Sequence, residues 1–299
     1  MAHQEVSVLA YNVADALSDG ARVPAVLNQM SLHRPTVAVF SEAYSSERGL
    51  NDSVVEDLEE LGYTTAHINQ ELYDERPDAH GVLVTARTEQ IAKIGPMLMA
   101  GRFAILAEVA TPESDETFTF LGYHGNDKDD EHRVADARGL IDHILTLAKG
   151  ADGTERVAKA TLVAGDLNSM DPRSHKAALL RSLQPYVDLL PSLPPNPSGN
   201  QLRLQRKASL AQRLSRMAIG EPLELLRSVG LEDIDPRNEP TLRAKGVAIK
   251  VDHILASQHF APVDHRVIRG ITVDGDVSGQ RLSDHDAILG TVQLLKMPL

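Results

Sequence analysis

The sequence predicts a single α/β domain, and three observations lead to that class. Patterns typical of strands and helices alternate along all 299 residues without a change in composition or a clear interdomain linker. Hydrophobic residues make up 42% of the chain, enough to bury a large core. Several short apolar strands end in polar residues, and ligands of α/β sheets collect at such ends. The length also permits two ordinary domains, but the unbroken alternation favours one.

The first half of the chain alternates short strands with amphipathic helices. Apolar residues recur at helical spacing in residues 22–33, which Pro35 ends, and in residues 51–61, which Gly62 closes. A polar segment at 69–79 is expected to be a loop. Strand patterns fill the remaining intervals: Val6–Tyr11, Thr36–Phe40, Tyr63–Ile68, Gly81–Ala86, 102–110 and 117–123.

The second half begins with a long predicted helix over residues 131–149, which Gly150 stops. Residues 171–245 are less regular, and we expect an irregular, partly helical insertion there. It would contain a Pro-rich loop at Pro191–Asn200 and a helix at 201–217. The remaining strands are predicted at Thr161–Ala164, Val247–Ala256, 265–273 and Ala287–Leu294.

Composition excludes several kinds of protein. The formal net charge is −12, which argues against a broad electropositive surface for nucleic acid. The chain has no cysteine, so disulfides, thiolate zinc sites and a cysteine nucleophile are excluded. Met1–Glu5 lacks the features of a signal peptide, and no apolar run approaches the roughly 18 residues of a membrane span. We therefore expect a soluble, cytoplasmic protein without a membrane span.

The segment Thr161–Asn168 carries the clearest chemical signal. Thr161–Ala164 reads as a buried strand, and Gly165 is expected to break it and allow a close approach of the backbone. Asp166 and Asn168 then follow at a spacing that points both side chains the same way on an extended chain. A carboxylate is a hard ligand for a divalent cation, and an amide can orient a phosphate oxygen or a water. The alternative is structural, with Asn168 or Ser169 capping the next segment.

Three other strands end in a comparable way, at Asn12, Glu42 and His124. Each residue alone has a structural alternative: a turn residue, a surface residue or a loop histidine. Four such endings in one chain favour a shared site over coincidence. Two further polar segments follow, Val251–Ile254 within a strand pattern and Leu282–Asp286 before the last strand.

Taken together, these segments resemble the endonuclease/exonuclease/phosphatase superfamily, which has the DNase I-like fold. The matching pieces occur in the family's order and span nearly the whole chain: Tyr-Asn-Val at 11–13, Ser-Glu at 41–42, Gly-Tyr-His at 122–124, Gly-Asp-Leu-Asn at 165–168, Val-Asp-His-Ile at 251–254 and Ser-Asp-His at 283–285. The resemblance implies a four-layer α/β/β/α sandwich, with two mixed β-sheets packed face to face and helices outside. It also implies hydrolysis of a phosphoester with Mg²⁺ or Mn²⁺ as cofactor.

The resemblance also assigns roles to residues. It makes Glu42 the main metal ligand, helped by Asn12 and Asp284. It places His285 at the scissile phosphate, with Asp252 holding its ring.

Three further positions complete the implied machinery. Asp166 would position or deprotonate the attacking water, Asn168 would bind a phosphate oxygen, and His124 would be a second phosphate-facing histidine. These roles agree with the needs of phosphodiester attack, namely a positioned water, compensation of charge on the phosphoryl oxygens and a stabilised leaving group. Asp252 and His253 alternate along a strand, so only one of them can point into the site. The resemblance selects Asp252, and we expect His253 to face elsewhere.

Other polar residues have weaker assignments. Arg102 could contact substrate or a carboxylate, and Arg138 is expected to make a structural ion pair. Asn126 is either a phosphate contact or a turn residue, and the acidic run 127–131 favours a solvated helix start. Residues 201–217 contain five basic residues and no acid, which favours a solvated helix face over a substrate-binding one.

The substrate is where the sequence leaves alternatives open. The superfamily includes nucleases acting on DNA or RNA and hydrolases of inositol phosphates, sphingomyelin and small phosphodiesters. Negative charge disfavours a non-specific duplex nuclease, and 4% aromatic residues with no Trp disfavour a base-stacking platform. A small or single-stranded phosphodiester is therefore favoured. The alternative from another class is a catalytically silent binding protein. The sequence indicates no protein partner.

Overall fold

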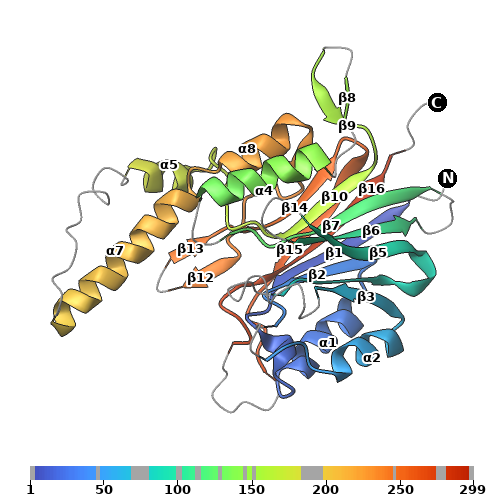
Figure 1. The fold of residues 1–299 in the computed structure, drawn as a ribbon, viewed down its shortest axis with the longest axis horizontal. Helices are drawn as coiled ribbons and strands as arrows, with labels where there is room; N and C mark the ends of the chain where they lie inside the picture. Colours follow the sequence, from blue (N-terminus) through green and yellow to red (C-terminus); the bar gives the residue numbers. More distant parts are fainter. Residues whose placement is uncertain are drawn as a thin grey trace.

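Two six-stranded β-sheets form the centre of the computed structural model (Figure 1). The structure describes residues 4–44, 48–68, 81–98, 103–111, 116–126, 130–143, 147–149, 153–182, 198–244, 247–273 and 281–295. In the first sheet the strand order is β15-β16-β1-β2-β4-β3, and in the second it is β11-β14-β10-β7-β6-β5.

The first sheet consists of β1 (Glu5–Asn12), β2 (Val37–Ser41), β3 (Tyr63–His67), β4 (Leu83–Arg87), β15 (Phe260–Ile268) and β16 (Ala287–Leu294). The second consists of β5 (Ile91–Leu98), β6 (Phe103–Ala110), β7 (Thr117–Gly122), β10 (Thr161–Asp166), β11 (Leu231–Asp233) and β14 (Asp252–Ser257). Each sheet is mixed, because β1 runs parallel to β2 and β7 runs parallel to β10, while the other pairs are antiparallel.

The sheets pack face to face through their central strands. β1 lies against β10 and β14, and β2 lies against β10 and β7. Gly122 shows how close this contact is, because a Cβ atom there would come within 2.2 Å of a Val84 methyl group. The apolar residues of both inner faces form one large core that includes Val8, Phe40 and Phe120. Their packing explains why these strands read as continuous apolar runs.

Helices cover the two outer faces, which completes the predicted four layers (Figure 1). Beside the first sheet lie α1 (Val23–His33) and α2 (Ser53–Glu60). Beside the second lie α4 (Asp130–His143) and α8 (Glu221–Ser228), whose apolar residues Leu140, Leu223 and Leu226 pack on it. The predicted fold class is therefore confirmed.

The described parts of residues 171–245 contain the helices α5 (His175–Ser182), α7 (Gly199–Met217) and α8 and the strands β11 and β12 (Leu242–Ala244). Leu214 and Met217 of α7 are buried with Ala177 of α5, as the predicted apolar face requires. Figure 1 shows α7 extending away from the two sheets. Among the described residues, no helix combines the length and apolar character needed to cross a bilayer.

Several predicted elements were wrong. The helix predicted at 131–149 ends at His143, and Leu147–Lys149 is instead a short strand, β8, paired with β9 (Glu155–Val157). The strand predicted at 265–273 is β15, which begins five residues earlier and ends at Ile268. The strand predicted at 247–256 is divided into β13 (Val247–Ile249) and β14. The predicted loop at 69–79, most of the loop at 191–200, Arg102 and residues 127–129 lie outside the described residues.

Gly165 does not break its strand, contrary to the prediction, because β10 continues through Asp166. The close approach of the backbone is nevertheless present. A Cβ atom at Gly165 would lie 2.0 Å from the Tyr123 carbonyl oxygen, and its φ of +137° is rarely adopted by L residues. Glycine at this position therefore lets β10 lie against the end of β7.

Candidate active site

The strand topology brings four predicted residues to one end of the sandwich. In the parallel pair β1 and β2, Asn12 ends β1 and Glu42 follows β2; in the parallel pair β7 and β10, His124 follows β7 and Asp166 ends β10. Parallel strands end at the same edge of a sheet, and these two pairs face each other across the core. Residues far apart in sequence therefore meet at one place.

Asp166 lies at the centre of this group. Its side chain is 1% exposed. Asn12 Nδ2 donates to Asp166 Oδ2 at 2.9 Å, and the backbone N–H of Asn168 donates to Oδ1 at 2.8 Å. The backbone N–H of Asp166 donates to Ser41 Oγ at 3.2 Å, a contact that the sequence reasoning did not anticipate. These bonds fix the carboxylate between the two sheets.

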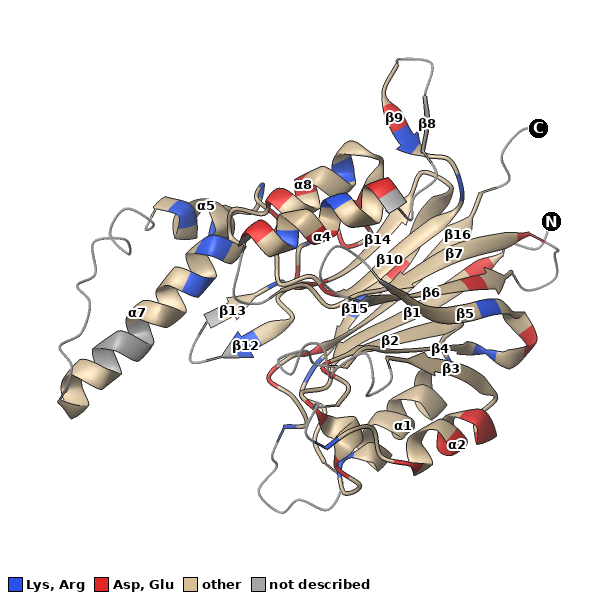
Figure 2. Ribbon diagram, viewed as in Figure 1, with Lys and Arg blue, Asp and Glu red and all other residues tan. Residues whose placement is uncertain are grey.

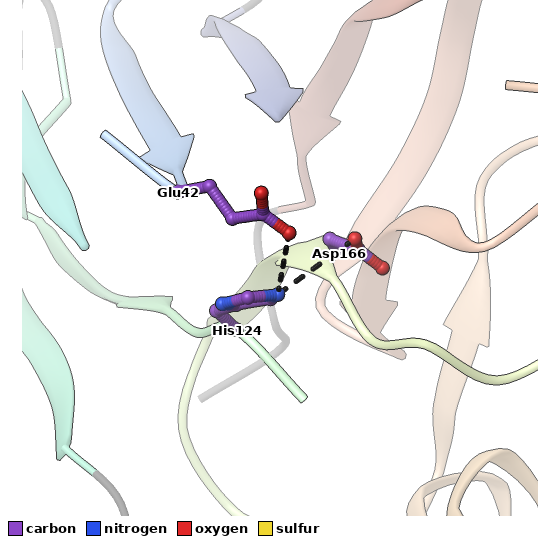
Figure 3. Close-up of side chains that lie close together, drawn as sticks. All are labelled: Glu42, His124 and Asp166. Atoms are coloured by element: carbon purple, nitrogen blue, oxygen red, sulfur yellow. Dashed lines mark ion pairs between the residues drawn. The ribbon is translucent and has the colours of Figure 1, made fainter. Parts of the chain in front are cut away.

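Glu42 and His124 approach Asp166 from the other sheet and from β7, respectively. His124 Nε2 lies 3.6 Å from Glu42 Oε1 and 3.8 Å from Asp166 Oδ2 (Figure 3). Asn168 Nδ2 donates to the Gly125 carbonyl at 3.0 Å and lies 3.3 Å from His124 Nε2. The amide of Asn168 thus ties the loop after β10 to the loop after β7.

Two of these side chains are carried by unusual backbone conformations. Glu42 has a φ of +46° and Asn168 a φ of +47°. Non-glycine residues with positive φ are uncommon and collect at functional sites, where the surrounding contacts hold them. Asn168 therefore reaches the site through a turn rather than along the extended strand that the sequence spacing suggested.

Asp252, the first residue of β14, and His285, two residues before β16, complete the group. Since β14 is antiparallel to β10, Asp252 lies directly beside Asp166 in the register. His285 Nδ1 donates to Asp252 Oδ2 at 2.8 Å, and His285 Nε2 lies 3.8 Å from Asp166 Oδ2. This contact fixes the tautomer and orients Nε2 toward the centre of the site.

The surroundings raise the pKa values of two groups, which favours the neutral form of the Asp166 carboxyl group and the charged form of the His285 ring. Burial raises the pKa of Asp166 to about 7, and the Asp252 carboxylate adds to this, while His285 and the bond from Asn12 act against it. Burial lowers the pKa of His285, but the charge and hydrogen bond of Asp252, with Asp166 and Asp284, raise it to about 10 overall. At neutral pH the site therefore holds a cationic imidazole beside a carboxyl group that is easily protonated.

Asp284 stands apart from the other predicted metal ligands. Its side chain is exposed, and among the described residues it belongs to neither group of close ligand atoms. Its charge still contributes to the raised pKa of His285. Asp284 instead lines an open cavity next to the site, together with Arg22 and Arg243.

The donor set fits a hard divalent cation. Glu42, His124 and Asp166 have ligand atoms within 4.8 Å of one another, and so do Asp166, Asp252 and His285. Carboxylate oxygens suit Mg²⁺ and Mn²⁺. The Glu42 side chain is 27% exposed, which leaves the group accessible from solvent.

Neighbouring contacts support the site from outside. His253 faces away from it, with Nδ1 2.6 Å from Asp233 Oδ2 and Nε2 donating to the Ser169 carbonyl at 2.7 Å. Lys250 lies 2.8 Å from the same Asp233 carboxylate. Arg138 pairs with Glu221 of α8 at 4.0 Å, as predicted. No sequence pattern pointed to Asp233 or Lys250, because isolated charges in irregular segments normally lie in solvent.

Comparisons with known proteins agree with this architecture. No family model matches the sequence, and no curated protein matches it. Solved structures do match. ANGEL2, described as a 2′,3′-cyclic phosphatase, is 14% identical with a TM-score of 0.60, and the match covers 98% of this chain and 96% of that one.

Two further solved structures also match over nearly the full length of both chains. An endonuclease/exonuclease/phosphatase family protein from Bacteroides thetaiotaomicron is 14% identical with a TM-score of 0.60, covering 99% of this chain and 100% of that one. A humanized TDP2 from D. rerio is 15% identical with a TM-score of 0.58, covering 97% and 99%. The chain therefore shares the DNase I-like fold of these structures, and the fold that the sequence resemblance implied is confirmed.

Proposed function

We propose that the protein is a metal-dependent phosphoesterase that hydrolyses a phosphodiester. The observation that carries the proposal is the position of Asp166. Its carboxylate lies 3.8 Å both from His285 Nε2 and from His124 Nε2, and Asn12 and Asn168 hold it from two sides. The fold is shared with ANGEL2, which is described as a 2′,3′-cyclic phosphatase, and this supports the same class of reaction.

Each residue has a role that its surroundings support. His285, kept cationic by Asp252, would donate from Nε2 to a phosphoryl oxygen and neutralise charge there. Asp166, with a pKa raised to about 7, would accept a proton from the attacking water. His124 and Asn168 would contact the remaining phosphoryl oxygens.

Mg²⁺ or Mn²⁺ would be held by Glu42 and Asn12, with Asp284 contributing from the exposed rim. When bound, such a cation stabilises charge on the phosphate and on the leaving oxygen. Asn12 donates to Asp166 through Nδ2, and its Oδ1 accepts from the Ala14 N–H at 3.1 Å. The second lone pair of Oδ1 would be the one that binds the cation.

The substrate that we favour is a small or single-stranded phosphodiester. The net charge of −12 is unfavourable for a long duplex. The description of ANGEL2 as a 2′,3′-cyclic phosphatase favours including cyclic nucleotides among the candidates. An inositol-phosphate or sphingomyelin-type phosphohydrolase is the alternative within the fold, and a binding protein without catalysis is the alternative outside it.

The experiment is a metal-supplemented screen with DNA, RNA, cyclic nucleotides, inositol phosphates, sphingomyelin and bis-p-nitrophenyl phosphate. We expect hydrolysis that EDTA abolishes and that Mg²⁺ or Mn²⁺ restores. His285→Ala and Asp166→Ala should each lower kcat by at least about 10²-fold, the usual contribution of such groups. Full activity in EDTA would reject the metal, and near wild-type turnover in either variant would reject the assigned roles. No hydrolysis of any substrate would favour the binding protein.

A further inference from the structure

An open cavity of about 540 Å³ lies next to the candidate active site, and three arginines line it. Its lining includes Ala14, two residues after Asn12, and Asp284, which directly precedes His285. Because consecutive Cα atoms are only about 3.8 Å apart, the cavity borders the site on the side of β1 and β16. Three arginines in one cavity are unexpected in a chain with a net charge of −12.

Two of these arginines share a single carboxylate. Arg243 Nε donates to Asp286 Oδ2 at 3.0 Å, and Arg281 Nη2 donates to Asp286 Oδ1. Asp286 is 1% exposed, whereas Arg243 and Arg281 keep 38% and 34% exposure. One negative charge compensates one of the two positive charges, so the pair retains an excess positive charge toward the cavity. Figure 2 shows the blue of β12, which carries Arg243, on the side of the sandwich that faces α7.

The third arginine, Arg22, donates only to carbonyl oxygens among the residues that the structure describes. It donates to the carbonyls of Ala14 at 2.9 Å, Val13 at 3.4 Å and Leu282. Within the described part of the chain it pairs with no carboxylate, so its charge is not neutralised. The same contacts bind the loop after Asn12 to the loop before His285, which holds the guanidinium in a fixed position.

Two acidic residues also line the cavity. Asp19 accepts from the Ala21 N–H at 3.0 Å through Oδ1, and Asp284 is the exposed residue assigned to the metal. Neither forms an ion pair with the three arginines in the part of the chain that the structure describes. With Asp284 engaged by a cation, the three arginines face two remaining carboxylates, those of Asp19 and Asp286, so the cavity keeps one excess positive charge. Guanidinium groups bind phosphate through two parallel hydrogen bonds, which makes a phosphate the best-suited partner.

We propose that this cavity binds a second phosphate group of the substrate, one that is not cleaved. The inference rests on the proposed function, because the cavity adjoins the site where the first phosphate would react. The preferred substrates then carry at least two phosphates. Such a group occurs as the neighbouring phosphate of an oligonucleotide and as an additional phosphate on a small phosphorylated polyol.

Two pairs of phosphodiesters distinguish these sources. The dinucleotides TpT and pTpT differ by one terminal phosphate, and so do glycerophosphoinositol and glycerophosphoinositol 4-phosphate. Affinity is measured by isothermal titration calorimetry with Mg²⁺ in the His285→Ala background, so that a cation can engage Asp284 while turnover is slow, and kcat/KM is measured with Mg²⁺ in the wild-type background. We expect the wild-type protein to favour the doubly phosphorylated member of at least one pair by about tenfold or more, as charged hydrogen bonds imply.

Arg243→Met and Arg281→Met should each remove most of that preference. Arg138→Met is the matched control, since this arginine lies on α4, is 63% exposed and does not line the cavity, and it should keep the preference. Thermal melting verifies that each variant is folded. If Arg243→Met fails to fold, Arg281→Met, which leaves Arg243 paired with Asp286, provides the answer.

The outcomes separate this inference from the proposed function. A preference in the nucleotide pair alone assigns an oligonucleotide, and a preference in the inositol pair alone assigns a polyol phosphate. Equal affinity within both pairs, or a preference unchanged in both variants, overturns the second-phosphate site even if hydrolysis is found. A preference lost in the variants without any hydrolysis supports the second-phosphate site and counts against the phosphoesterase.

Discussion

Replacing Asp252 by asparagine should lower the pKa of His285 and with it the alkaline limit of activity. The pKa of the imidazole is raised from 6.5 to about 10, and the Asp252 carboxylate at 2.8 Å is the first of the causes that raise it. At about 1.36 kcal/mol per pKa unit, this corresponds to roughly 5 kcal/mol in favour of the charged ring. The neutral amide of asparagine can still accept a hydrogen bond from Nδ1, so the ring keeps its orientation while the electrostatic contribution is lost.

The expected change follows from the sign of the shift. A nearby opposite charge usually moves a pKa by about 1–3 units, so we expect the alkaline limb of the pH–rate profile to move down by that amount. The loss of kcat/KM should therefore be larger at pH 9 than at pH 7. Below the pKa of Asp166, about 7 in the wild type before a cation binds, activity should fall because the base becomes protonated, and in Asp252→Asn this fall should occur at lower pH because the Asp252 carboxylate also raises the pKa of Asp166.

NMR titration of the His285 ring in EDTA measures the same quantity without relying on any substrate. Asp264→Asn is the matched control, because it makes the same change at an exposed position of β15 and should leave the ring unaffected. A wild-type ring that titrates near 6.5, or an Asp252→Asn ring that titrates at the wild-type pH, would refute the electrostatic argument.

Three further predictions concern the framework of the site. Lys250→Met should lower the free energy of unfolding by about 3–5 kcal/mol because Asp233 is left buried without its cation. Lys159→Met, at an exposed position, is the control and should have little effect. Equal denaturant midpoints for the wild type and Lys250→Met would contradict the prediction. Burial raises the pKa of Asp233, but Lys250 and His253 hold it well below its usual range. The stability that the ionised Asp233 contributes is therefore present above about pH 4 and is lost as the pH falls. Urea melts should accordingly show the free energies of unfolding of the wild type and Lys250→Met converging in acid. Gly165→Ala should destabilise by more than about 1 kcal/mol, while Gly95→Ala, which meets nothing within 4 Å, should cost less in the same melts.

The sequence predicted the inner strands of the sandwich better than its edges. β1, β2, β7 and β10 are almost entirely buried, so each is a continuous apolar run that local pattern alone identifies. β5 was missed because Gly95 and Pro96 read as breakers, although an edge strand tolerates proline. β15 is also an edge strand, and its largely exposed residues gave no alternation to mark where it begins.

The predicted end of the helix at 131–149 was wrong for a different reason. Apolar residues continue from Leu140 to Leu147, and a short apolar run suits a helix or a strand equally well. The pairing of β8 with β9 makes Leu147–Lys149 a strand rather than the last turn of the helix.

The sequence by itself determined which residue types stand at the ends of the inner strands, because strand burial and side-chain chemistry are local properties. These local properties are sufficient to identify Asn12, Glu42, His124 and Asp166 as candidates. Only the tertiary structure decided how these groups interact. Burial and charge at distances of 2.8–3.8 Å raise the pKa of Asp166 and His285, and these distances depend on segments up to 154 residues apart. The placement of Arg22, Arg243 and Arg281 around one cavity has the same origin, since long-range packing leaves no periodic pattern in the sequence.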